Sequence, residues 1–174
     1  MARQLVTLLQ KPKEAVFHNA FNTMQAAGVR IAIDLKLFHV LDTDDSLKTA
    51  ADLPKLCGAD EVFMIRILRM LSSLNFIEEV DVLTYSTSPI AHALTNPPLE
   101  AMCIHVYDQG LPSIANLPAY MKQTSHQSPS DGENGPFQAR HKTNLPAFDF
   151  WVTQPEVFTN FNTFMKNNDE DQAS

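Results

Sequence analysis

The stretch DEVFMIRILRMLSSLNFI, residues 60–77, decides the fold because it is the most regular amphipathic segment of the chain. Its large apolar side chains recur at i, i+3, i+4, i+7 and i+10, which is one stripe of an α-helix: Met64, Ile67, Leu68, Leu71 and Leu74. Gly58 can end a preceding helix in the left-handed conformation, and Asp60 can accept hydrogen bonds from the free amides of the next turn. The pattern predicts a core helix that starts at Asp60.

The segments on either side of this helix complete a recognisable order of elements. Residues 76–80 and 82–85 are short β-prone runs separated by Asp81, which predicts a small hairpin. Upstream, Thr49 and Asp52 have the T-x-x-D spacing of a helix start. Two helices followed by a hairpin predict a mainly α fold: a winged-helix-like helical domain with a small β-hairpin, extended at its C-terminal side by further helices.

Residues 21–41 form a longer apolar pattern with two faces. One stripe includes Met24 and Gly28, and the other includes Val29 and Ile33, so a single helix is expected to need cover on both sides. A partner chain could supply the second cover, and so could residues 1–20 or 140–165 of the chain itself. Within residues 1–20 two short helices are expected, with a break at Pro12.

Composition limits the classes of protein to which the chain can belong. Its 174 residues are 44% hydrophobic, which is enough for a real core. No apolar run reaches the roughly 18 residues of a membrane span and the first residues do not resemble a signal peptide, so we expect a soluble, cytoplasmic protein with no membrane partner. Cys57 and Cys103 support neither a disulfide framework nor a zinc site. The net charge of −7 and the acidic hairpin argue against a nucleic-acid partner.

Residues beyond the hairpin are helical in pattern but frequently interrupted. Residues 99–121 are expected to form helices broken at Gly110, Pro112 and Pro118. Residues 122–136 are polar and rich in Gly, Pro and Ser, which predicts a mobile loop, and residues 166–174 predict a disordered tail.

The order of these features resembles the plant and fungal small-molecule O-methyltransferases that depend on S-adenosylmethionine, and is most similar to the fungal members. The similar segments are AIDLKLFHVL (32–41), the run at 49–80, YSTSPIAHAL (85–94) and residues 135–165. The resemblance implies that residues 1–98 are a winged-helix-like dimerisation domain. It also implies that residues 99–165 connect this domain to a catalytic one and cap the acceptor pocket.

The cofactor-binding half of that family has no counterpart in these residues. The family holds its methyl donor on a Rossmann-like sheet with a glycine-rich turn, yet none of the five glycines here form a G-x-G pair. No catalytic base and no cofactor can be carried over from the family, so a self-sufficient methyltransferase is not expected. The leading hypothesis is a truncated homologue or a fragment that acts as a non-catalytic dimerisation and aromatic-ligand-capping module in secondary metabolism. It would form a homodimer, or a heteromer with a full-length O-methyltransferase.

An alternative hypothesis is a stand-alone, cofactor-free enzyme such as a cyclase, isomerase or dehydratase. Its candidate catalytic residues are His105, Asp108 and Tyr107, because an Asp three residues along a helix can orient a His as a general base. A surface or capping cluster is the competing interpretation. The histidines show no H-x-x-x-H spacing, so no metal site is expected.

Residues 137–165 are unusually dense in aromatic side chains. By resemblance, some of them wall a pocket for a flat aromatic or polyketide molecule, and the candidate ligand-binding residues are Phe148, Trp151, Phe161, Phe164 and Met165. Ordinary core packing is the competing interpretation, since Phe158, Phe161 and Met165 also form a helix stripe.

Overall fold

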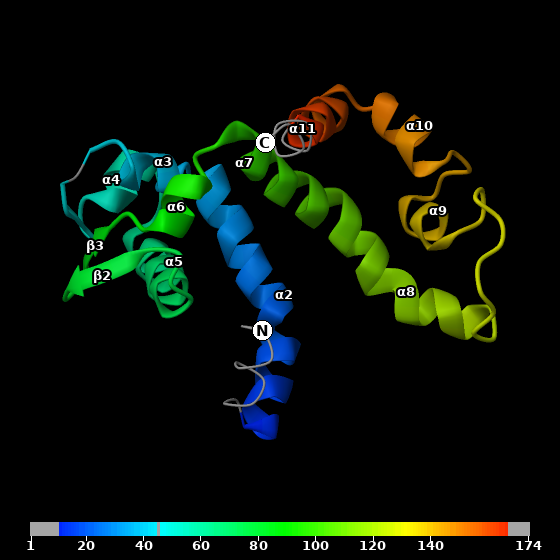
Figure 1. The fold of residues 1–174 in the computed structure, drawn as a ribbon, viewed down its shortest axis with the longest axis horizontal. Coiled ribbons are helices and arrows are strands. Elements are labelled where there is room, and N and C mark those ends of the chain that lie inside the picture. The colour runs from blue at the N-terminus through cyan, green and yellow to red at the C-terminus, as the bar shows by residue number, and fades with distance from the viewer. Residues whose placement is uncertain (1–10, 45, 167–174) are drawn as a thin grey trace, which may run out of the picture. The chain divides into compact units, whose positions relative to one another are not determined.

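The structure is a computed structural model that describes residues 11–44 and 46–166 (Figure 1). These residues fall into two compact units, of which the first holds residues 11–41 and 46–88 and the second holds residues 42–44 and 89–166. The chain is mainly helical and carries one small antiparallel sheet of three strands, which confirms the predicted class.

The first unit contains four helices and three strands among the described residues. They are α2 (Pro12–Asp34), α3 (Leu37–Leu41), β1 (Lys48–Thr49), α4 (Leu53–Cys57), α5 (Glu61–Ser73), β2 (Glu78–Asp81) and β3 (Thr84–Ser86).

Helix α5 is the centre of the first unit, as its sequence predicts. Asp60 is the N-cap, and its Oδ1 accepts a hydrogen bond from the Phe63 amide at 2.9 Å. Gly58 ends α4 with a φ of 69°, in the left-handed region that glycine adopts at little cost. Met64 and Leu68 are fully buried, whereas Leu74 caps the helix end and is half-buried. The predicted start and the predicted stripe of this helix are therefore both confirmed.

Helix α2 differs from its prediction at both ends. Pro12 lies in its first turn, where a missing amide costs nothing, so Pro12 begins the helix instead of breaking it. The predicted helix over 21–41 is also interrupted, because Lys36 adopts a φ of 52° and a separate short helix follows it. The other helix expected within residues 1–20 falls outside the described residues. Deeper in the unit, Gly28 lies directly against the thioether of Met70, so α2 and α5 approach closely there.

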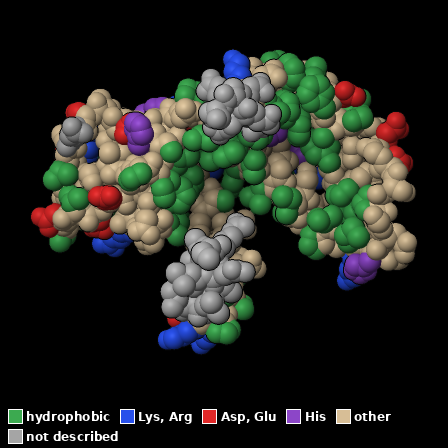
Figure 2. All heavy atoms as spheres, in the orientation of Figure 1, with side chains coloured by type: hydrophobic (Ala, Val, Ile, Leu, Met, Phe, Trp, Pro, Cys, Tyr) green, Lys and Arg blue, Asp and Glu red, His purple; other side chains and the backbone are tan. Residues whose placement is uncertain are grey.

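The sheet has the order β1-β3-β2, with both pairings antiparallel. The predicted hairpin is confirmed as β2 and β3, and strand β1 is an addition that the sequence analysis missed because Thr49 was assigned to a helix start. Tyr85 on the central strand is fully buried, whereas every residue of β2 is exposed. Three carboxylates therefore line an edge strand, and Figure 2 shows acidic side chains at the tip of this hairpin.

Helices are the regular secondary structure of the second unit, within its described residues. Its elements are α6 (Pro89–Ala93), α7 (Pro97–His105), the π-helix η1 (Val106–Gly110), α8 (Leu111–Gln123), α9 (Pro136–His141), α10 (Ala147–Val152) and α11 (Pro155–Met165). Helix α11 packs along α7, and α9 packs on α8.

The predicted helix breaks in 99–121 are wrong in detail. Gly110 lies within η1, Pro112 occupies the first turn of α8, and Pro118 lies inside α8. Pro112 is tolerated because first-turn amides have no partner within a helix, and the neighbours of Pro118 keep the helix intact around it. Residues 127–131 of the predicted loop contain no helix or strand. The Tyr120 hydroxyl, which precedes the loop, donates a hydrogen bond to the carbonyl of Asn134 near the loop's end at 2.7 Å. Apart from Lys166, the predicted tail lies outside the described residues.

Among the residues that the structure describes, no helix combines the length and apolar character needed to cross a membrane.

Candidate functional site

The aromatic residues of the second unit gather into one group of rings, which we call the ring cluster. It comprises His105 from α7, Phe137 and His141 from α9, Phe148, Phe150 and Trp151 from α10, and Phe158, Phe161 and Phe164 from α11. Short helices placed around α7 bring these rings together from a span of 60 residues, 105–164.

Trp151 is the centre of the ring cluster. The His105 ring meets it edge-on with centroids 4.5 Å apart, and the Phe161 ring lies 5.2 Å away. Phe137 adds a second edge-on contact to Trp151 at 6.0 Å, and such edge-to-face pairs are a favourable arrangement of aromatic rings.

Four of the five predicted ligand-binding residues belong to this cluster. Phe148 contacts Phe161 at 5.7 Å and is 50% exposed, so it marks the accessible edge of the rings. Phe164 lies 6.4 Å from His105. Met165 lies at the end of α11, is 40% exposed and forms no part of the ring cluster as defined here. The rings that the resemblance assigns to ligand binding thus meet in space.

The predicted acid/base group lies at the end of α7 and on η1. His105 is only 7% exposed, and burial lowers the pKa of its imidazole more than the nearby Asp108 carboxylate raises it. No hydrogen bond reaches His105 Nδ1, so Asp108 does not orient the ring through that atom. Asp108 is exposed and Tyr107 is half-buried, and both lie on the π-helix that follows His105. The geometry holds a neutral histidine among aromatic rings.

Three further polar residues of the second unit, one of them the cluster member His141, were not singled out by the sequence analysis. They are Gln109, His141 and Gln154, each of which has a buried side-chain atom without a hydrogen-bond partner. His141 stacks on Phe137 at 4.3 Å, and burial lowers its pKa although the Gln109 carbonyl acts in the opposite direction. No spacing motif could have found these residues, since only folding brings them together.

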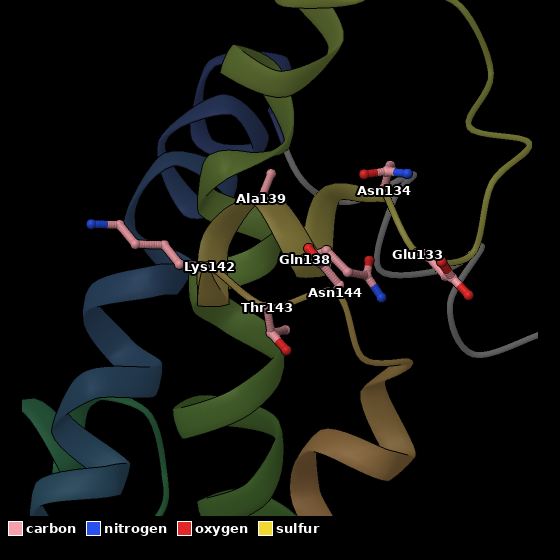
Figure 3. A pocket seen from close by; sticks show the side chains of 7 residues that line it. All are labelled: Glu133, Asn134, Gln138, Ala139, Lys142, Thr143 and Asn144. Atoms are coloured by element: carbon pink, nitrogen blue, oxygen red, sulfur yellow. The ribbon is translucent and has the colours of Figure 1, made fainter.

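A separate polar hollow of about 260 Å³ lies beside α9 (Figure 3). Gln138 lines this hollow, and its side-chain oxygen accepts a hydrogen bond from the Gly135 amide at 3.1 Å. The Gln138 amide group also donates to the carbonyls of Gly132 at 2.8 Å and Leu145 at 3.0 Å. These three bonds explain why a glutamine is buried here, and they give it a structural role in closing the loop.

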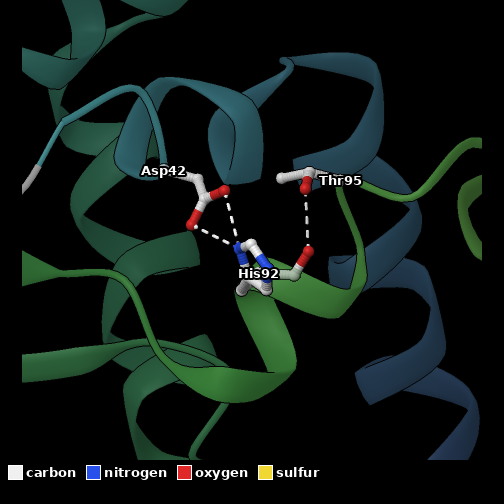
Figure 4. A network of polar contacts seen from close by, with 3 residues as sticks. All are labelled: Asp42, His92 and Thr95. Carbon is white, nitrogen blue, oxygen red and sulfur yellow. Dashed lines mark hydrogen bonds and ion pairs between the residues drawn. The ribbon is translucent and has the colours of Figure 1, made fainter.

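His92 ties the acidic turn after α3 to α6 within the second unit (Figure 4). Its Nδ1 lies 2.9 and 3.1 Å from the two carboxylate oxygens of Asp42, while Thr95 donates to the His92 carbonyl at 2.8 Å. The exposed position of the His92 ring indicates a structural contact at the surface.

Within residues 11–44 and 46–166, no three His, Cys, Asp or Glu side chains come together in a way that could hold a metal ion. Cys57 and Cys103 are free thiols whose pKa values are raised by burial, so both are poor nucleophiles near neutral pH.

No protein-family model matches the chain. It is 29% identical to O-methyltransferase penC of Penicillium thymicola over 96% of its own length and 42% of that protein. It is also 29% identical to O-methyltransferase lepI of Aspergillus flavus, over 94% of its length and 42% of that protein.

Solved structures agree with the sequence comparisons. The structure of LepI in complex with SAM matches with a TM-score of 0.89 and 28% identity, covering 95% of this chain and 42% of that one. The crystal structure of OxaC matches with a TM-score of 0.84 at 17% identity, which shows a shared fold alone. The chain is thus similar, over nearly its whole length, to fungal O-methyltransferases, but it spans less than half the length of the relatives it matches.

Proposed function

We propose that these residues form a non-catalytic dimerisation and aromatic-ligand-capping module of the O-methyltransferase type, active in fungal-type secondary metabolism. Similarity to fungal O-methyltransferases over 94–96% of the chain supports the assignment. In this proposal the first unit is the winged-helix-like dimerisation part, and the second unit caps a flat aromatic or polyketide molecule. The module does not bind S-adenosylmethionine by itself, because its glycines offer no G-x-G turn.

The observation that carries the proposal is the exposed apolar surface on the first half of α2. Val16 is 70% exposed, Phe17 54%, Phe21 47% and Met24 63%. Phe17 and Phe21 stack on each other with centroids 6.4 Å apart, so they form one continuous apolar strip. Contiguous apolar surface of this kind is typical of a protein interface. A second copy, or a full-length O-methyltransferase, would bury it.

Light scattering on the purified chain tests the proposed self-association. We expect a dimer. The double variant Phe17→Glu with Phe21→Glu should raise the dissociation constant of this dimer at least about tenfold, since buried charges in an apolar interface are costly. Val82→Glu is the matched control, because Val82 is 83% exposed in the hairpin and lies outside the strip. A wild-type chain that stays monomeric and also fails to bind penC or lepI would contradict the dimerisation role.

Calorimetry with S-adenosylmethionine tests the non-catalytic part. We expect no binding by the isolated chain, and tight stoichiometric uptake accompanied by methyl transfer would overturn it.

The alternative function, a cofactor-free enzyme, is favoured by one specific observation. His105 is buried beside Trp151 and its pKa is lowered by burial, and a neutral imidazole can accept a proton as a general base. A structure described as a pericyclic reaction enzyme matches this chain with a TM-score of 0.88 and 29% identity. Under this hypothesis His105, with Asp108 and Tyr107, promotes a cyclisation, isomerisation or dehydration of the capped molecule.

The two functions differ in whether an aromatic ligand is chemically changed after it binds to the chain. Mass spectrometry and chiral chromatography would detect a product only if the chain is an enzyme, and a His105→Gln variant should then keep binding but lose turnover. Unchanged turnover in His105→Gln would remove the assignment of this residue, and absence of any product would leave the non-catalytic module.

A further inference from the structure

Four Ser or Thr side chains of this sequence are followed by an acidic residue three positions later. They are Thr49, Ser128, Ser130 and Thr153. A protein kinase with a basic substrate groove selects a hydroxyl by the acids that follow it, because opposite charges favour the correct encounter. The kinase also needs a hydroxyl that it can reach and a backbone that can enter its cleft, and the structure separates the four residues on this second requirement.

Two of the four hydroxyls are held within regular structure. Thr49 lies in β1, and its Oγ1 donates a hydrogen bond to the Asp52 carboxylate at 2.6 Å. Thr153 is the C-cap of α10, and its Oγ1 donates to the Phe150 carbonyl at 2.6 Å. A kinase could use either one only after local opening, which lowers the fraction of chains that can react.

The other two hydroxyls lie on the connection between α8 and α9. Residues 127–131 of this connection form no helix or strand, and Figure 1 shows them as an open yellow stretch. Each residue from 125 to 134 is exposed. Within the described residues, the Ser130 hydroxyl forms no hydrogen bond. Little structure has to open before this stretch can enter the cleft of another protein.

Ser128 and Ser130 differ in the residues that follow them. Ser128 precedes Pro129, whose ring removes an amide and restricts the backbone of Ser128. Ser130 precedes Asp131 and has Glu133 three positions later, so two carboxylates follow it closely. The Asp131 side chain accepts a hydrogen bond from the Glu133 amide at 2.8 Å, and this turn keeps both acids at the surface. Ser130 therefore carries the more complete pattern.

We propose that Ser130 is a phosphorylation site for a Ser/Thr kinase that recognises acidic substrates. The Ser130 Oγ attacks the γ-phosphorus of magnesium-bound ATP, and the new O–P bond forms as the bond to the β–γ bridging oxygen breaks. The hydroxyl proton passes to the catalytic aspartate of the kinase, and ADP leaves. The product gains a charge of about −1.5 to −2 beside Asp131 and Glu133. This modification is independent of the function proposed above.

Incubation of the purified full chain with casein kinase II, Mg²⁺ and ATP tests the proposal. Tandem mass spectrometry should find one phosphoryl group, on Ser130. A synthetic peptide of residues 122–136 reports the reactivity of the same sequence without the fold. The full chain should react at a rate within about threefold of the peptide, because an exposed stretch outside helices and strands has little protection to lose.

Matched variants test the reacting hydroxyl and the recognising charge. Ser130→Ala should abolish the modification, whereas Ser128→Ala should leave its rate unchanged. Glu133→Gln should lower kcat/KM for phosphorylation at least about tenfold, because it removes the charge and keeps the side-chain shape. Glu156→Gln is the control, since Glu156 is the acid that follows Thr153 and should not affect Ser130.

Each of the remaining results would contradict the proposal. A phosphoryl group on Thr49, Ser128 or Thr153 in place of Ser130 would show that the residue is wrongly assigned. A full chain that reacts at least about tenfold more slowly than the peptide would show that the fold protects Ser130. An unchanged rate in Glu133→Gln would remove the acidic recognition, and failure of both chain and peptide to react would remove the site. Light scattering still decides the dimerisation role, whichever of these results is obtained.

Discussion

The contact between Gly28 and Met70 allows a prediction for Gly28→Ala whose size depends on the side chain at position 70. A Cβ atom at position 28 would lie 1.7 Å from Met70 Cε and 2.6 Å from Sδ, so the thioether would have to move. Alanine in place of glycine inside a helix contributes about 1 kcal/mol, whereas overpacking costs about 1–3 kcal/mol. Cε and Sδ are the far end of a flexible, half-buried side chain, so the cost lies at the low end of this range. We expect Gly28→Ala to leave the free energy of unfolding nearly unchanged, because a cost of about 1 kcal/mol offsets the gain.

Removing the thioether should release the gain in helix propensity. In a Met70→Ala background the new methyl group meets no obstacle, so Gly28→Ala should raise the free energy of unfolding by about 1 kcal/mol. The double-mutant cycle then gives a coupling of about 1 kcal/mol between the two positions. Urea denaturation followed by far-ultraviolet circular dichroism measures all four chains.

Gly110→Ala is the matched control for helix propensity. A Cβ atom at Gly110 meets nothing within 4 Å, so this change should be neutral or stabilising in both backgrounds. If Gly28→Ala stabilises the wild-type chain as much as it stabilises the Met70→Ala variant, the inferred close approach of α2 and α5 is wrong.

Three further predictions concern caps, protonation and the α9 loop. Asp60→Ala should lower the free energy of unfolding, measured by urea denaturation, by about 1 kcal/mol because the Phe63 amide loses its acceptor. Asp60→Asn should be nearly neutral, and equal losses in the two variants would refute the cap. Burial lowers the pKa of His105 and His141, so the unfolded chain binds more protons than the folded one just below pH about 6.5. Thermal stability should therefore fall as the pH drops below this value, and His105→Phe should flatten the decline; an unchanged slope in His105→Phe would refute it. Gln138→Ala removes three hydrogen bonds, so hydrogen exchange of the Gly135 amide should accelerate at least about tenfold. Asn144 is exposed, so Asn144→Ala should leave this exchange rate unchanged. Slow exchange in Gln138→Ala would show that other contacts close the loop.

The features predicted well from the sequence are those fixed by neighbouring residues. The cap at Asp60, the left-handed Gly58 and the buried stripe of α5 each depend on contacts within a few positions, and periodicity and cap chemistry report these directly. The hairpin is likewise local, since its two strands are adjacent in the chain.

The features predicted poorly are decided by contacts between distant residues. Lys36 adopts a left-handed conformation although it is neither glycine nor asparagine, so the sequence gives no local signal of the turn. The turn allows Leu37 and Phe38 to be buried in the core. Strand β1 is two residues long and forms only by pairing with β3, so it has no periodicity of its own. Pro118 shows the converse, since it interrupts a sequence pattern without interrupting the helix.

The candidate site divides in the same way. Aromatic density and the family resemblance indicated most of the rings, and the structure places Trp151 at the centre of the cluster. The buried amides of Gln109 and Gln154 were missed because glutamine is common on helix surfaces, and nothing local distinguishes a buried one.

The acidic edge strand β2 has a consequence for how the chain behaves in concentrated solution. An edge strand presents unpaired amides and carbonyls that can recruit strands from other molecules and seed aggregation. Glu78, Glu79 and Asp81 place like charges along that edge, and an approaching copy of the same hairpin would bring the same charges with it. Gln or Asn replacements keep the side-chain oxygens that accept hydrogen bonds from the Val82 and Leu83 amides, and they remove only the charge. Such a chain should precipitate more readily, so the negative charge of the strand protects against fibrous assembly.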